Sequence, residues 1–151
     1  MINIKFKSLF IIVPLLAGII FFQSCEKEKD EISKSELLTD NIWAYDTLEV
    51  SASTDAGFLL AAAVLHMAYE GCEYDFYKEG TYDMASDLTS MSGTWELIED
   101  KTLLLDKGTD DEMSLEIIKI TSNNASFKLH LEGDFFETPF SGDVTLKFIA
   151  K

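Results

Sequence analysis

The sequence predicts a mainly β protein, a barrel or a sandwich of about eight short antiparallel strands with one helix. Three observations support this fold class. Apolar and polar residues alternate with a period of two in several segments, short polar turns separate these segments, and one continuous apolar run breaks the pattern. Alternation is typical of strands with one buried face. Many short strands joined by tight turns are typical of barrels and sandwiches.

The strands follow one another in hairpins. A first strand is expected over residues 42–50, although its buried face is ambiguous. Turns at Lys78-Glu79-Gly80, Glu99-Asp100-Lys101 and 122–125 each separate two alternating segments, which indicates three hairpins. A last strand alternates at Val144, Leu146, Phe148 and Ala150. Between the second and third of these turns, Ile117, Ile118 and Ile120 break the alternation, which predicts either a β-bulge or burial on both faces.

The continuous apolar run, residues 58–69, predicts a helix. Thr54 or Asp55 can cap its start, and Gly71 can end it. Its apolar residues lie nearly all round the helix, and at about 14 residues it is too short to span a bilayer. We therefore expect it across an open end of the barrel or partly inside it, as a plug or fixed cap. The following residues would then belong to the core: Phe58, Leu59, Leu60, Val64, Leu65 and Met67.

The N-terminus resembles a bacterial lipoprotein signal peptide. Lys5 and Lys7 precede a short apolar run at 9–22, and Phe22-Gln23-Ser24-Cys25 is similar to a lipobox. The resemblance implies that residues 1–24 are removed and that Cys25 receives a covalent lipid. The alternative is a secretory signal cleaved elsewhere, with Cys25 as an ordinary thiol.

The mature chain would consist of an acidic flexible tether, residues 25–35, and one domain, residues 36–151. Loss of Lys5 and Lys7 leaves 10 basic against 27 acidic residues, so the formal charge changes from −15 to −17. Nucleic-acid binding needs clustered basic residues, so we expect no nucleic-acid partner. Contact with a membrane should come through acyl chains on Cys25. Only Cys72 then remains, which leaves no internal disulfide.

Two short motifs resemble a known family. Residues 72–82 contain Cys, then Phe, then Gly-Thr-Tyr, and residues 93–97 read Gly-Thr-Trp-Glu-Leu. Both are similar to small lipocalin-like lipoproteins of the Bacteroides group. The family implies an eight-stranded β-barrel that holds a small apolar ligand, on an outer-membrane lipoprotein. The acidic stretch at 26–31 resembles a surface-export signal. This chain departs from the family pattern where Asn41-Ile42 replaces Gly before Trp43, and in its apolar helix.

The sequence offers little catalytic chemistry. His66 and His130 lie in different elements with no motif around them, and metal-ligand spacings and phosphate loops are absent from the sequence. Residues 106–112 are acidic, but they lack the order of an EF-hand loop, so a solvated acidic turn is expected there. Cys72 is expected to be a small buried side chain. We predict no enzyme activity, no metal, and no cofactor other than the lipid on Cys25.

Aromatic residues are the remaining candidates for function. They can line a cavity for a small apolar ligand or fill the core completely. The set is Trp43, Tyr74, Phe76, Tyr82, Trp95, Phe127 and Phe148. The first possibility predicts a lipid-anchored, non-enzymatic ligand-binding protein of the cell envelope. The alternative is an accessory interaction protein with a filled barrel, which binds another envelope protein or a polysaccharide.

Overall fold

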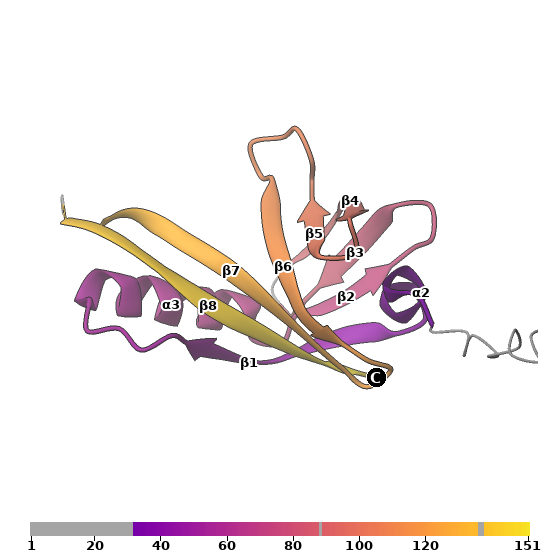
Figure 1. The fold of residues 1–151 in the computed structure, drawn as a ribbon, viewed down its shortest axis with the longest axis horizontal. Coiled ribbons are helices and arrows are strands. Elements are labelled where there is room, and N and C mark those ends of the chain that lie inside the picture. The colour runs from indigo at the N-terminus through magenta and orange to yellow at the C-terminus, as the bar shows by residue number, and fades with distance from the viewer. Residues whose placement is uncertain (1–31, 88, 136–137) are drawn as a thin grey trace, which may run out of the picture. The chain divides into compact units, whose positions relative to one another are not determined.

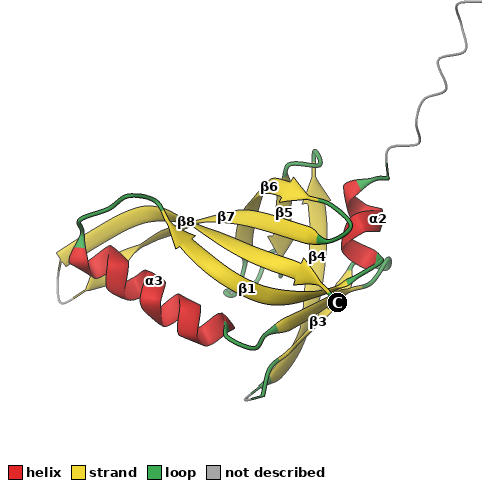
Figure 2. Cartoon of the chain, turned by 90° about the horizontal axis from the view of Figure 1, so that it is seen from below, coloured by secondary structure: helices red, strands yellow, loops and turns green. Residues whose placement is uncertain are grey.

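Eight antiparallel strands close into a barrel in which each strand pairs with its neighbours in the chain, and β8 pairs with β1 (Figures 1 and 2). The computed structural model describes residues 32–87, 89–135 and 138–151. The predicted fold class is confirmed. The strands are β1 (Ile42–Val50), β2 (Glu73–Phe76), β3 (Thr81–Ala85), β4 (Ser90–Ile98), β5 (Thr102–Leu105), β6 (Met113–Ile120), β7 (Asn124–Phe135) and β8 (Thr138–Ala150).

The three predicted hairpins are β2–β3, β4–β5 and β6–β7. Gly80 adopts a positive φ of 84° in the first turn, a conformation that favours glycine. The pairing of β6 with β7 shifts register between Ile117 and Lys119, and the side chain of Ile118 is 53% exposed. The broken alternation of the isoleucines therefore reflects a bulge and not burial on both faces.

A short helix that the sequence analysis did not predict lies at one end of the barrel. Helix α2 (Lys34–Thr39) occupies residues that were assigned in part to the tether. Ser33 and Glu36 form a capping box, a pattern readable in the sequence as Ser-x-x-Glu before Leu37. Leu38 is fully buried, and its carbonyl accepts a hydrogen bond of 3.0 Å from Trp43 Nε1. Lys34 donates to the Asp100 carbonyl in the β4–β5 turn, so α2 covers this end.

Helix α3 (Ala56–Tyr69) forms where predicted, with Asp55 as its N-cap, but it contributes fewer core residues than expected. It packs along β1, β7 and β8 (Figure 2), on the face of β8 that also carries Leu146 and Phe148, and its last residue, Tyr69, lines the central void. Of the six residues expected in the core, Phe58 alone is buried, and Leu65 is half-buried. The other four are exposed: Leu59, Leu60, Val64 and Met67.

The position of α3 follows from unequal strand lengths. β7 pairs with β6 only as far as Lys128, whereas it pairs with β8 out to Phe135. The β7–β8 hairpin therefore extends beyond the rest of the barrel as a two-stranded ribbon. An isolated two-stranded ribbon is only marginally stable in water, and packing against a helix stabilises it. Helix α3 supplies that packing, which explains why it lies along the strands.

Gly142 lets α3 approach the ribbon closely. A Cβ built at this position would lie 2.6 Å from Cζ of Phe58, which is closer than real Cβ atoms come to a ring carbon. Phe58 is fully buried in this contact. A glycine on β8 is thus needed for the first turn of α3 to pack on the sheet.

Candidate ligand site at the open end of the barrel

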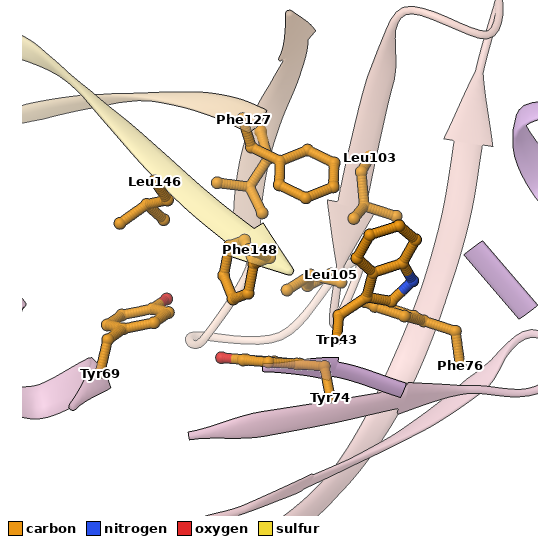
Figure 3. A pocket seen from close by; sticks show the side chains of 10 residues that line it. Trp43, Tyr69, Tyr74, Phe76, Leu103, Leu105, Phe127, Leu146 and Phe148 are labelled. Atoms are coloured by element: carbon orange, nitrogen blue, oxygen red, sulfur yellow. The ribbon is translucent and has the colours of Figure 1, made fainter. Parts of the chain in front are cut away.

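The barrel interior is filled by side chains. The central void measures about 20 Å³, close to the space one water needs, and ten residues line it (Figure 3). Five of the seven predicted aromatic residues face it: Trp43, Tyr74, Phe76, Phe127 and Phe148. Their rings pack against one another, with centroids 5.8 Å apart for the Tyr74–Phe148 and Phe127–Phe148 pairs. There is no space for a ligand at the centre of these rings.

Trp95 also belongs to the packed structure. Its ring meets Phe76 edge to face, and its Nε1 donates to the Tyr77 carbonyl at 2.9 Å. Both tryptophan N–H groups therefore have backbone partners. Buried indole groups generally need such partners. The two residues help to close the end of the barrel near α2, where they are not accessible to a ligand.

The other end of the barrel is open and hollow. A cavity of about 520 Å³ lies between the C-terminal end of α3, strands β2 to β6 and the β5–β6 loop, residues 106–112. Its walls combine three tyrosines with three methionines, and its rim carries four carboxylates. The lining residues are Ala68, Tyr69, Cys72, Tyr74, Tyr82, Met84, Met91, Leu105, Asp106, Asp110, Asp111, Glu112 and Met113. Tyr74 and Tyr82 are thus the members of the predicted aromatic set that face a space large enough for a small ligand.

Hydrogen bonds fix the wall formed by β3, β4 and the loop. Tyr82 donates its hydroxyl hydrogen to Asp106 at 2.7 Å, and the same carboxylate accepts from the Thr94 N–H at 2.9 Å. Gly93 makes room for this arrangement, because a Cβ there would lie 2.2 Å from Asp106 Oδ1. This contact gives a physical reason for the glycine of the Gly-Thr-Trp motif.

The tyrosine side chains of the cavity are held neutral. Burial raises the pKa of Tyr69, Tyr74 and Tyr82 above its ordinary value of 10.0. For Tyr82 the bond to Asp106 raises the pKa further, because ionisation would place two negative charges together. The Tyr69 hydroxyl lies 3.5 Å from the sulfur of Met113. The cavity wall therefore presents uncharged aromatic rings and thioethers at neutral pH.

Cys72 is buried at the inner edge of the cavity, as its sequence context predicted. Its Sγ lies 3.5 Å from the Ala68 carbonyl, and burial raises the pKa of the thiol. The thiolate is the reactive form of cysteine, so these surroundings favour an inert side chain.

The outer face of α3 forms a second notable surface. Leu59, Leu60, Val64 and Met67 are 41–63% exposed, and no charged residue occurs between Ala56 and Tyr69. A groove of about 380 Å³ runs beside these residues, between α3 and the β7–β8 ribbon. Monomeric proteins rarely leave such continuous apolar surface uncovered.

A polar group that the sequence analysis missed lies on the β7–β8 ribbon. Ser141 Oγ is 3.1 Å from His130 Nε2, and His130 Nδ1 is 2.7 Å from Asp143 Oδ1. The order of atoms matches a Ser-His-Asp triad. However, His130 and Asp143 are about half exposed, and the backbone N–H groups of a sheet lie in its plane and not above its face. The geometry favours a set of polar side chains that hydrogen-bond across two strands. The pairing register of β7 with β8, which puts His130 opposite Asp143, is the signal that would have revealed it.

The histidine of α3 and the acidic loop both form hydrogen bonds. His66 is exposed on α3, with Nδ1 2.6 Å from the Tyr45 hydroxyl. In the acidic loop, Glu112 accepts from the Gly108 N–H at 2.7 Å. Within the described ranges, no three His, Cys, Asp or Glu residues are placed to hold a metal ion, and no helix is long and apolar enough to cross a membrane. Cys25, the signal peptide and most of the tether lie outside the described residues.

No family model matches the chain, and no curated protein sequence matches it. A crystal structure of a DUF4847 family protein from Bacteroides vulgatus ATCC 8482 aligns with a TM-score of 0.46 and 12% sequence identity, covering 76% of this chain and 95% of that one.

Proposed function

We propose that this chain is a lipid-anchored, lipocalin-like protein of the bacterial cell envelope that binds a small apolar molecule without catalysis. The observation that carries the proposal is the open cavity of about 520 Å³, lined by tyrosines and methionines at the end of a filled, closed barrel. A filled interior gives such a site a rigid base, and small-molecule sites often lie in the mouths of barrels. The ligand site is thus at the mouth and not at the centre, where the resemblance suggested it.

A neutral apolar fluorophore such as N-phenyl-1-naphthylamine tests the ligand site. Met91 lines the cavity, and Met91→Gln keeps its size while making it polar. We expect about five-fold weaker binding, equivalent to about 1 kcal/mol of lost apolar contact. Met67→Gln is the matched control, because Met67 is 63% exposed on the outer face of α3. Absence of binding by the unmodified protein, or equal binding by the Met91→Gln protein, would refute the cavity as the site.

The second candidate is an accessory interaction protein that binds another envelope protein through α3. The exposed aliphatic face of α3 favours it, together with the filled barrel. Aliphatic side chains suit a protein partner better than a polysaccharide, since sugar rings usually stack on aromatic rings. A photo-crosslinking residue at Val64 should then give one discrete protein adduct in intact cells, and the same residue at Lys119 on β6 should give none. If the fluorophore bound to this face of α3 and not in the cavity, Met67→Gln would weaken its binding and Met91→Gln would not.

A further inference from the structure

We propose that the ligand of the open-end cavity is an amphipathic organic cation, an amine or quaternary ammonium group attached to an apolar body. This inference rests on the proposed ligand site and adds the charge of the ligand. The cavity combines an apolar wall with a rim of one sign of charge, because Asp106, Asp110, Asp111 and Glu112 line it and no Lys or His does.

The four rim carboxylates differ in their hydrogen-bond partners. Asp106 is held by Tyr82 and Thr94, and Glu112 is held by the Gly108 N–H. The side chains of Asp110 and Asp111 are exposed and form no hydrogen bond or ion pair with another described residue. Asp110 and Asp111 therefore place two negative charges, without a positive partner among the described residues, at the entrance of the cavity.

The nearest lysine in the chain interacts electrostatically with Glu112 on the rim but pairs with Glu96 and not with Asp110 or Asp111. Lys107 Nζ lies 2.8 Å from Glu96 Oε2, and this pair lies outside the set of residues that line the cavity. The bond to Glu96 is the largest cause that raises the pKa of Lys107, so the lysine stays charged and paired. A ligand cation would thus meet the Asp110 and Asp111 carboxylates without an internal competitor.

The wall suits the same ligand. A cation is attracted to the face of an aromatic ring, by about 0.5–1 kcal/mol at exposed sites and more when water is excluded. Tyr69 and Tyr82 line the cavity with rings that are neutral at physiological pH, whereas Tyr74 is stacked against Tyr69 and Phe76. Met84 and Met91 face each other across β3 and β4, and flexible thioethers adapt to apolar groups of different shape.

The charge of the whole chain acts in the same direction. The mature chain, with 10 basic and 27 acidic residues and a formal charge of −17, attracts cations and repels anions over about a Debye length, roughly 8–10 Å at physiological salt. An anionic amphiphile of the same size would fit the apolar wall but would meet four carboxylates at the rim. The charge of the rim therefore favours a cationic over an anionic amphiphile, although the two would fit the apolar wall equally well.

The test compares three ligands with the same octyl chain by isothermal titration calorimetry: octyltrimethylammonium, 1-octanol and octanoate. The protein is the mature chain from residue 25 with Cys25→Ala, which needs no detergent. We expect the cation to bind about ten-fold more tightly than octanol at low salt, with octanoate weakest, and the preference to shrink in high salt. Equal binding of all three, or a preference for octanoate, overturns the inference and leaves the ligand site intact. No binding of any of them overturns the proposed function as well.

A pair of double variants separates the rim from the general surface charge. Asp110→Asn with Asp111→Asn removes two charges from the rim. Glu79→Gln with Glu99→Gln removes two charges from exposed turns at the other end of the barrel. The first variant should bind octyltrimethylammonium about five-fold more weakly with unchanged octanol affinity. The second should bind both ligands as the unmodified protein does, and an equal loss in both variants overturns the inference.

Discussion

At the scale of single residues, the structure explains why two glycines in strands matter. Gly93 leaves space for the Asp106 carboxylate beside Tyr82, and Gly142 leaves space for the ring of Phe58. In both places the missing side chain allows a second element to come close. The apparent weakness of a glycine in a strand thus has a packing reason.

Gly142→Ala should destabilise the protein. The new methyl group would lie 2.6 Å from Phe58 Cζ, and the fully buried ring has little room to move. We expect a loss of about 1–3 kcal/mol in the free energy of unfolding, measured by urea denaturation. Gly133→Ala is the matched control on β7, because its Cβ would lie 3.1 Å from the half-buried ring of Phe140. An effect of Gly133→Ala as large as that of Gly142→Ala would contradict this account.

Cys25→Ala should release the protein from the membrane fraction or block its maturation. The proposed anchor is a set of acyl chains on this thiol, each buried methylene of which contributes about 0.8 kcal/mol. Cell fractionation and metabolic labelling with palmitate measure the outcome. Cys72→Ala removes the other, buried cysteine and should leave membrane association unchanged. Mass spectrometry that found an unmodified Cys25 in the mature protein would end the lipoprotein interpretation.

At the scale of elements, the structure adds a helix that was not predicted and leaves most of the predicted helix partly exposed. The short helix α2 covers an end of the barrel, and the long apolar helix α3 lies along the β7–β8 ribbon. The apolar content of α3 suggested that six of its residues belong to the core, whereas four of them are exposed. The difference arises because α3 must cover the part of β7 and β8 that the neighbouring strands leave unpaired.

Leu38→Ala in α2 should cost about 2–5 kcal/mol of stability, as for other large-to-small changes in a core. Leu38 is fully buried beside Trp43. Leu60→Ala in α3 should change stability by less than about 0.5 kcal/mol, because Leu60 is 41% exposed. Thermal or urea denaturation measures both. A larger loss for Leu60→Ala than for Leu38→Ala would restore the plug that the sequence analysis expected.

At the scale of the whole molecule, packing governs the ionisation of the tyrosines. All five have a raised pKa, although the first cause differs among them. Burial raises the pKa of Tyr45 to about 12. A hydrogen bond of 3.0 Å to the Asp83 carboxylate is the main cause that raises the pKa of the half-buried Tyr77 to about 12.

Stability should therefore fall at alkaline pH. A group whose pKa is raised in the folded state contributes stability that is fully present below its unfolded value, here 10.0. That contribution is lost as the pH rises through the folded value, which is about 12 for Tyr45 and Tyr77. We expect little tyrosinate absorbance near pH 10.5 in the folded protein, and ionisation together with unfolding at higher pH. Titration of most tyrosines near pH 10 with the fold intact would contradict the packing described here.

The sequence by itself determined the hairpin turns, the central part of most strands and nearly the whole extent of α3, and it limited the segment near Ile118 to a bulge or burial on both faces. Alternation, turn residues and caps act over a few neighbouring residues, so they can be read without the fold. Only the tertiary structure decided that the rings fill the barrel, that α3 lies along the β7–β8 ribbon with one face exposed, and that a cavity opens beside Tyr82. These features depend on strand lengths and register, which bring together residues such as Gly93 and Asp106, or Phe58 and Gly142, from distant parts of the chain. Local periodicity carries no information about the space left between such residues.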